Sequence, residues 1–284
     1  MNKKLLAIGC IVLLSFTAFA QSEADFEFKM AEDGSGWSIV KYNGTSAKVT
    51  IPSKKDGKPV IFIGGLAFNE NKTITSVIIP EGVTGIEDGI VENRGQDSYP
   101  RGAFSECEKL SSVKLPSTLK FIGNNAFFNC PNLDSITIPK GTSRIGNSAF
   151  SLSGLKSITL PASLTMISDF SFVRCKMLKS IVIPGSVKSI GESAFYGCES
   201  LDSVKLSQGT TIIHEGAFAM CSALKEISLP ASIEIIDSLA FYSCSSLTTI
   251  NIPSSVKDVV ISGNAFQGCP LNAASLALIK KYSR

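Results

Sequence analysis

Cysteine is the residue type with chemical potential that recurs most regularly in this chain. Seven cysteines each follow a phenylalanine by three residues: Cys107, Cys130, Cys175, Cys198, Cys221, Cys244 and Cys269. A zinc site is not favoured, because the sequence has no C-x-x-C or histidine–cysteine spacing. The fixed position suits either disulfides between neighbouring units or a ladder of buried thiols. Asn71 and Ser153 at the equivalent position of two units favour packing over pairing.

Other residues with catalytic potential are scattered along the chain. The single histidine, His214, lies in I-I-H-E-G, where other units carry glycine or aspartate, so we expect a solvated turn residue. The sequence contains no G-x-S-x-G elbow, phosphate-binding loop, dinucleotide fingerprint or H-E-x-x-H motif. Carboxylates occur at non-equivalent positions and do not indicate an acid pair for glycoside hydrolysis. We therefore predict a protein that is not an enzyme, with no catalytic residues, no cofactor and no metal.

The cysteines belong to a repeat whose most constant residue is the phenylalanine three positions earlier. These aromatic anchors are Phe68, Phe104, Phe127, Phe150, Phe172, Phe195, Phe218, Phe241 and Phe266. Their successive intervals are 36, 23, 23, 22, 23, 23, 23 and 25 residues. A period of this size is typical of a solenoid, in which each unit buries its apolar face against its neighbours. We expect the nine rings to form one continuous buried spine.

Each unit begins with a short strand in which apolar and polar residues alternate. In one unit Ile136 and Ile138 point inward, so Ser135 and Thr137 face solvent. A proline usually ends the strand, because it has no N–H to donate to a ladder. A second apolar pair follows, and we expect the Ala-Phe pair to close the unit in a tight helical turn.

The solvent-facing strand positions are the main candidate binding surface, which we call the hydroxyl strip. Its residues are Ser112, Lys114, Ser135, Thr137, Ser157, Thr159, Ser180, Val182, Ser203, Lys205, Glu226, Ser228, Thr249 and Asn251. The strip is rich in hydroxyls, carries a few charges and lacks aromatic residues, whereas tight protein interfaces favour Trp, Tyr and Arg. We interpret it as a weak, extended binding face, or simply as β-forming residues that are soluble on an exposed sheet.

An insertion lengthens the first interval between phenylalanines. The 36-residue step exceeds 23 by 13, and the extra residues lie at about 88–100. Long loops in compact folds are often functional, although a tolerated surface loop is the alternative. The candidate residues of this insertion loop are Glu92, Arg94, Asp97 and Tyr99. Asp88, Glu92 and Asp97 also suggest calcium, but their spacing is not that of an EF-hand loop.

Both ends of the chain depart from the repeat, which occupies residues 47–271. Residues 1–20 have the basic start, apolar run and A-F-A cleavage site of a secretory signal peptide. Lipoprotein processing at Cys10 is a weaker alternative. Residues 21–46 predict an N-terminal β cap with Trp37 in its core. Residues 272–284 predict a C-terminal capping helix, since Asn272 is a good N-cap.

The charge of the chain limits its partners. Removal of residues 1–20 takes away Lys3 and Lys4 and no acid, so the formal net charge falls from +3 to +1. A nearly neutral protein has no global field that attracts nucleic acid or anionic lipid. The mature chain has no stretch of transmembrane length. We expect an exported protein that is extracellular, at the cell surface or periplasmic, without nucleic acid as a partner.

The unit L-x-x-I-x-I-P-x-x-V-x-x-I-G-x-x-A-F-x-x-C resembles the repeat of BspA-like bacterial leucine-rich-repeat surface proteins. The matching residues in one unit are Leu178, Ile181, Ile183, Pro184, Val187, Ile190, Gly191, Ala194, Phe195 and Cys198. The resemblance covers about residues 37–271. It implies a curved, right-handed leucine-rich-repeat solenoid whose β-sheet, and thus the hydroxyl strip, lies on the concave side. It also implies a secreted or surface protein, since some members adhere to host matrix or plasma proteins such as fibronectin and fibrinogen.

Three functions remain open at this stage. The first is a protein-binding surface module or adhesin, which the repeat architecture and the predicted export favour. The second is a glycan-binding envelope protein for nutrient capture, which would need an aromatic cluster such as Tyr99 with Tyr196 and Tyr242. The third is a purely structural envelope component without a specific ligand.

Overall fold

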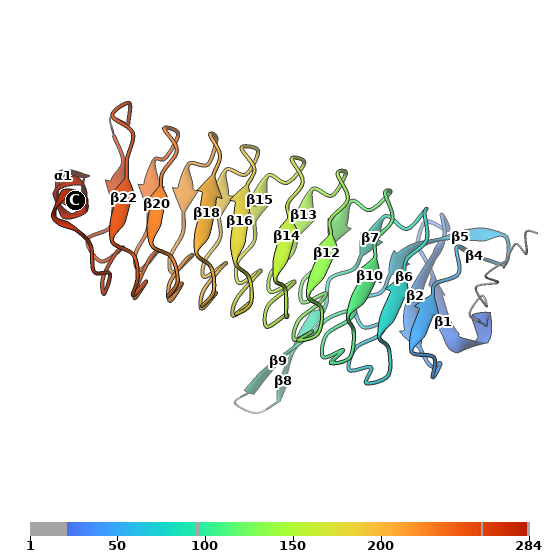
Figure 1. The fold of residues 1–284 in the computed structure, drawn as a ribbon. Helices are drawn as coiled ribbons and strands as arrows, with labels where there is room; N and C mark the ends of the chain where they lie inside the picture. Colours follow the sequence, from blue (N-terminus) through green and yellow to red (C-terminus); the bar gives the residue numbers. More distant parts are fainter. Residues whose placement is uncertain (1–21, 95–96, 257, 283–284) are drawn as a thin grey trace, which may run out of the picture.

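A computed structural model describes residues 22–94, 97–256 and 258–282. The side chains of residues 93–98 and the predicted signal peptide at 1–20 lie outside the described part. The chain winds into a row of stacked coils, with a β-hairpin at one end and a helix at the other (Figure 1). This arrangement confirms the predicted leucine-rich-repeat solenoid with repeats of about 23 residues.

The first ladder of strands carries the alternating pattern recognised in the sequence. Its members are β3 (Lys48–Thr50), β6 (Ser76–Ile78), β10 (Ser112–Lys114), β12 (Ser135–Thr137), β14 (Ser157–Thr159), β16 (Ser180–Ile183), β18 (Ser203–Leu206), β20 (Glu226–Ser228) and β22 (Thr249–Asn251). Equivalent residues pair in parallel register, as Ser135 does with Ser157. Hydrogen-bonded pairing divides this ladder into three sheets, β3–β6–β10, β12–β14 and β16–β18–β20–β22.

A second ladder of strands lies on another side of the coils, where the sequence had indicated only a second apolar pair. It consists of β5 (Lys58–Ile63), β7 (Gly85–Ile86), β11 (Phe121–Ile122), β13 (Arg144–Ile145), β15 (Met166–Ile167), β17 (Ser189–Ile190), β19 (Ile212–Ile213), β21 (Ile235–Ile236) and β23 (Val260–Ile261). Each of the strands from β11 onward contributes one buried isoleucine, while the residue before it is half-buried or exposed. These strands also pair in parallel register, within two sheets that are separated between β13 and β15.

The Ala-Phe pairs lie in turns on the remaining side of each coil, and no residue of these turns is assigned to a helix. The predicted helical turn is absent because the N–H groups bond to the next coil instead. The Phe104 N–H donates to the carbonyl of Ala126 at 2.7 Å, and Phe127 donates likewise to Ala149 at 2.7 Å. Residues two positions before and after Phe127, Asn125 and Asn129, adopt positive φ and make the same kind of bond.

The nine phenylalanine rings form the predicted spine. Adjacent ring centroids from Phe68 to Phe266 are 4.9 to 5.6 Å apart, and their planes lie within 13° of parallel. Tyr42 continues the stack towards the N-terminus, with its centroid 5.2 Å from that of Phe68. Burial of each such ring stabilises the fold by roughly 1.5–3 kcal/mol, so the spine is a major source of stability.

The cysteines form a ladder of unbridged thiols beside this spine. All seven are free, six are buried and Cys269 is half-buried, which confirms the buried-thiol interpretation. Each thiol donates to the carbonyl of the phenylalanine in the preceding coil, as Cys198 does to Phe172 at 3.2 Å. Burial raises the pKa of the Cys221 thiol to about 12, so this thiol is protonated and unreactive at neutral pH.

The N-terminal end of the stack carries a different arrangement. A short 3-10 helix η1 (Glu23–Asp25) precedes β1 (Phe26–Met30), which pairs antiparallel with β2 (Trp37–Tyr42), and β2 pairs parallel with β5. The strand β4 (Lys54–Lys55) folds back onto β5. The Trp37 indole N–H donates to the carbonyl of Lys55 at 2.8 Å, and the ring packs against Phe28. Trp37 is thus a structural residue of this end.

The C-terminal end is covered by the helix α1 (Ala273–Tyr282). Asn272 caps it, since its side-chain oxygen accepts from the Ser275 N–H at 2.9 Å. The buried Ser275 hydroxyl accepts from the Ile250 N–H at 2.9 Å, which satisfies a donor of the last strand of the first ladder. Among the described residues, no helix has the length and apolar character that crossing a membrane requires.

The insertion forms a hairpin of two antiparallel strands, β8 (Ile90–Arg94) and β9 (Asp97–Arg101). The hairpin projects away from the stack of coils (Figure 1). It leaves its coil after the second-ladder strand β7 and returns before the turn at Phe104. It therefore departs from a different edge of the coil than the first ladder.

Candidate functional site

The hydroxyl strip lies on the outer face of the first ladder, as the alternation predicts. Thirteen of its fourteen residues are exposed, and Thr249 is half-buried. Thr249 differs because the adjacent helix cap covers it, with the Asn272 side-chain amide donating to its hydroxyl at 3.2 Å. The strip is thus an open surface that ends where α1 begins.

Serines occupy the equivalent strand position on six consecutive coils, five of them within the strip and one beside it. Ser76, which the sequence analysis had not included, pairs in register with Ser112, Ser135 pairs with Ser157, and Ser180 pairs with Ser203. Hydrogen-bonded neighbouring strands lie about 4.8 Å apart, so each of these three pairs presents two hydroxyls at nearly that spacing, and the pairing is interrupted between β10 and β12 and between β14 and β16. A hydroxyl both donates and accepts, so these serines can bond to a partner with either polarity.

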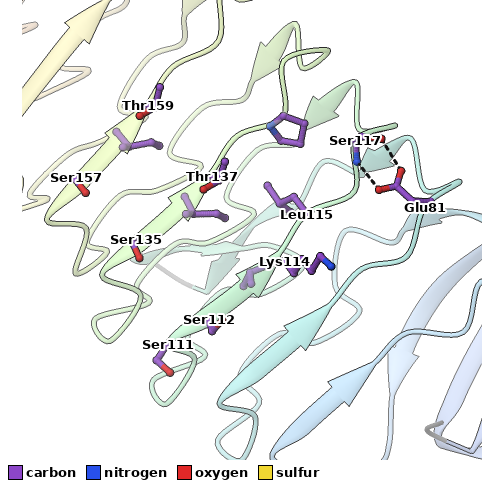
Figure 2. Close-up of a pocket in the computed structure, with 14 residues that line it drawn as sticks. Glu81, Ser111, Ser112, Lys114, Leu115, Ser117, Ser135, Thr137, Ser157 and Thr159 are labelled. Carbon is purple, nitrogen blue, oxygen red and sulfur yellow. Dashed lines mark hydrogen bonds between the residues drawn. The ribbon is translucent and has the colours of Figure 1, made fainter. Parts of the chain in front are cut away.

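The strip is hollowed where it crosses β10, β12 and β14. The hollow has a volume of about 630 Å³ and is lined by six strip residues: Ser112, Lys114, Ser135, Thr137, Ser157 and Thr159. Figure 2 shows their side chains rising from three neighbouring strands. The hydrogen-bonded pairing of the first ladder is interrupted between β10 and β12, so the hollow spans a discontinuity in the sheet.

One edge of this hollow carries a carboxylate that the sequence analysis did not identify. Glu81 accepts from the Ser117 N–H at 3.0 Å and from the Ser117 hydroxyl at 2.9 Å (Figure 2). These two bonds hold the pKa of Glu81 below its ordinary value, and the bond from the Ser117 backbone N–H has the larger effect. The hollow therefore has an oriented anion at one edge and the Lys114 ammonium nearby. Lys114 belongs to the strip that the sequence predicted, whereas Glu81 follows the first-ladder strand β6, which is the signal that could have identified it.

The insertion residues are separate from the strip. Glu92 forms an ion pair with Arg101 at 3.0 Å, and Arg101 also lies 3.7 Å from Glu70. Tyr99 is 45% exposed and lies opposite Glu92 in the hairpin register. Arg94 and Asp97 are paired backbone positions whose side chains fall outside the described part of the structure. The base of the hairpin is thus held by charges.

The calcium hypothesis finds no support in the described residues. Asp88 pairs with Arg144 at 3.0 Å and also accepts from the Asn124 N–H at 2.8 Å. Glu92 is engaged by Arg101, and the Asp97 side chain is not described. In the residues that the structure covers, no group of three or more acidic, histidine or cysteine side chains is arranged to hold a metal.

The proposed aromatic cluster does not form, because its tyrosines lie in different parts of the molecule. Tyr99 is on the projecting hairpin, whereas Tyr196 and Tyr242 lie in phenylalanine turns two coils apart, with Ala219 between them. His214 is half-buried at a coil corner, and its Nδ1 lies 3.1 Å from a carboxylate oxygen of Asp237. It has no place in the strip.

The repeat and its stacked geometry agree with a family model. The model for the BspA type leucine rich repeat region matches residues 42–99, 96–187 and 165–280, with six copies. The chain belongs to the BspA-type leucine-rich-repeat family. No curated protein sequence matches this BspA-type chain.

Solved structures of several bacterial leucine-rich-repeat proteins are similar to this BspA-type protein. The T. pallidum leucine-rich-repeat protein TpLRR is 23% identical with a TM-score of 0.52, over 93% of this chain and 98% of that chain. A leucine-rich cell surface protein from Faecalibacterium prausnitzii is 25% identical with a TM-score of 0.43, over 93% and 97%. The pneumococcal vaccine antigen PcpA is 18% identical with a TM-score of 0.40, over 90% and 88%.

Proposed function

We propose that this BspA-type protein is an exported, non-catalytic module of the cell surface that binds a protein ligand through the hydroxyl strip. Host matrix or plasma proteins are the candidate ligands. The observation that carries the proposal is the set of exposed serines at equivalent positions of successive coils, hollowed over β10, β12 and β14. Regular coils hold these side chains on strands, so little side-chain ordering is needed on binding.

The chemistry of the strip favours an extended protein segment. Hydroxyls about 4.8 Å apart on paired strands can bond to successive polar groups of a partner chain. The charges of Glu81 and Lys114 at the hollow would set the direction of that segment. Each neutral hydrogen bond contributes only about 0.5–1.5 kcal/mol, so useful affinity requires many contacts or several copies.

The residues of this face do not favour catalysis. The Ser135 hydroxyl donates to the Asp134 carboxylate at 3.2 Å, but no histidine lies in the strip, and His214 lies on a coil corner beside Asp237. A serine nucleophile is normally activated by a base that a third group orients in turn, and no such set is assembled among the strip residues. A purely structural role without a ligand is the remaining alternative, and it predicts no saturable binding.

A direct test measures binding of the chain that lacks residues 1–20 to surface-immobilised fibronectin and fibrinogen. We expect saturable binding that weakens about tenfold or more in Ser135→Arg and Ser157→Arg, because the added side chains fill the hollow. Ser245→Arg, at an exposed position outside the strip, is the matched control and should bind normally. Equal binding by all variants, or no binding to either ligand, would contradict the proposal.

A further inference from the structure

The turn side of the coils carries a second hollow, which neither the repeat pattern nor the hydroxyl strip explains. It has a volume of about 550 Å³ and is lined by Arg174, Lys176, Tyr196, Gly197, Glu199, Met220, Ser222 and Ser243. Its volume lies within the roughly 300–1,000 Å³ typical of small-molecule sites. The residues come from four consecutive phenylalanine turns, so the solenoid stacking itself assembles the hollow.

One residue that lines the hollow is a glycine. Gly197 occupies the position two residues after a phenylalanine, with a φ of +68°, where other coils carry Arg174 and Met220. A Cβ at Gly197 would lie 3.2 Å from Cγ of Arg174. The missing side chain therefore leaves a notch, with Arg174 on one coil and the 41% exposed Met220 on the other as its walls.

Of the three charged side chains around the notch, two form an ion pair and one positive charge is left over. Lys176 forms an ion pair with Glu199 at 2.8 Å, so those two charges largely compensate each other. Within the described residues, the exposed Arg174 guanidinium has neither an ion pair nor a side-chain hydrogen bond. An unpaired guanidinium that lines the same hollow as the half-buried Tyr196 is suited to a planar anionic group.

We propose that this hollow binds one carboxylated sugar residue of a surface glycan. The guanidinium of Arg174 would take the carboxylate in a bidentate pair, and the Tyr196 ring would cover the apolar face of the pyranose. Glu199, Ser222 and Ser243 supply acceptors and hydroxyls for the sugar hydroxyls. An acidic peptide is less suited, because its flexible carboxylate has no rigid ring to place against Tyr196. This site is independent of the strip and of its protein ligand.

Calorimetric titration of the chain that lacks residues 1–20 tests the site with two carboxylated probes, sialyllactose and a galacturonic acid trimer. Lactose and a galactose trimer are their uncharged counterparts, and a triglutamate peptide probes simple anion attraction. We expect at least one carboxylated sugar to bind, with the stronger probe identifying the source, and the uncharged sugars and the peptide to bind about tenfold more weakly or not at all. Equal binding of a neutral sugar or of triglutamate would overturn the proposal, as would silence of both acidic sugars at millimolar concentration.

Substitutions at the notch test whether the acidic sugar binds there. Arg174→Gln and Tyr196→Ala should each weaken the acidic sugar about tenfold, because each removes one recognition element. Lys188→Gln, which removes a charge at an exposed position just before the second-ladder strand β17, and Tyr242→Ala, which truncates a tyrosine two coils away, should leave the affinity unchanged. Sugar binding that survives both notch variants, with folding verified by circular dichroism, would place the ligand elsewhere and overturn the assignment.

Discussion

The Phe195 and Phe218 rings lie 5.2 Å apart with their planes 3° from parallel, although 22 residues of chain separate them. The Phe195 N–H donates to the carbonyl of Ala217, immediately before Phe218, at 2.7 Å. Ring stacking and this backbone bond act at the same point of each coil. Successive coils are therefore joined at the phenylalanine turn by both ring stacking and a backbone hydrogen bond.

Truncation of a central phenylalanine ring tests how much the stacking contributes to the stability of the fold. We expect Phe195→Ala to destabilise the fold by about 3–5 kcal/mol, because it leaves a cavity between two stacked rings. Lys205→Ala, at an exposed position, should change the stability by less than about 0.5 kcal/mol. Urea unfolding followed by circular dichroism measures both, and equal transition midpoints would refute the spine as a source of stability.

The cysteine ladder predicts a loss of stability in alkaline solution. Burial raises the pKa of Cys175 and of Cys221 from 9.0 to about 12. The unfolded chain therefore releases these protons above pH 9 while the folded chain keeps them, so stability declines as the pH rises from about 9 towards 12. Each such thiol contributes a slope of up to about 1.4 kcal/mol per pH unit.

Cys221→Ser isolates this effect, since a serine hydroxyl does not ionise and can still donate to the Phe195 carbonyl. Unfolding free energies measured by urea titration at several pH values from 8 to 11 should fall less steeply for the variant than for the parent chain. Parallel curves would show that the thiol does not ionise on unfolding.

Close approach between coils predicts that one glycine cannot be replaced. A Cβ at Gly154 would lie 2.0 Å from the carbonyl oxygen of Pro131 in the preceding coil. Gly154→Ala should therefore cost about 1–3 kcal/mol or more, because backbone must move apart. Gly263→Ala is the matched control, since a Cβ there meets nothing within 4 Å. Thermal melting compares the two, and an unchanged Tm for Gly154→Ala would contradict the observed packing.

The junction between the last coil and α1 gives a further prediction. Ser275→Ala leaves the buried Ile250 N–H without its acceptor and should cost about 1–3 kcal/mol. Leu276→Ala, whose parent side chain is 54% exposed, should have little effect. Hydrogen exchange at Ile250 is the local measurement, and unaltered protection in Ser275→Ala would show that the helix does not secure this strand.

Much of the fold was accessible from the sequence because its signals are local and repeated. The fixed spacing of residues such as Phe195 and Cys198 identified the spine and the thiol ladder, and alternation placed Ser135 and Thr137 on the outer face. The second ladder was missed because a strand such as Ser189–Ile190 has too few residues to show alternation. The turns were predicted as helical because a single unit does not reveal that its N–H groups bond to the next coil.

The candidate sites were less accessible, because they depend on neighbours from different coils. The exposure of the strip follows from one strand, but the hollow beside Glu81 requires the register between strands. The notch at Gly197 is visible only once Arg174 and Met220 are stacked on either side of it. Conversely, the sequence suggested grouping Tyr99 with Tyr196, and the coil order separates them.

The hydrogen bonds of the phenylalanine turns are the same from coil to coil, so interior coils are structurally interchangeable. Interior coils present nearly the same donors, carbonyls and rings to both neighbours, as Phe172, Phe195 and Phe218 do. Duplication or deletion of one 23-residue unit would therefore preserve the contacts between the remaining coils. It would change the length of the solenoid by about 4.8 Å. Gene-level gain and loss of units can in this way adjust the length of the molecule to its target without redesign of its interior.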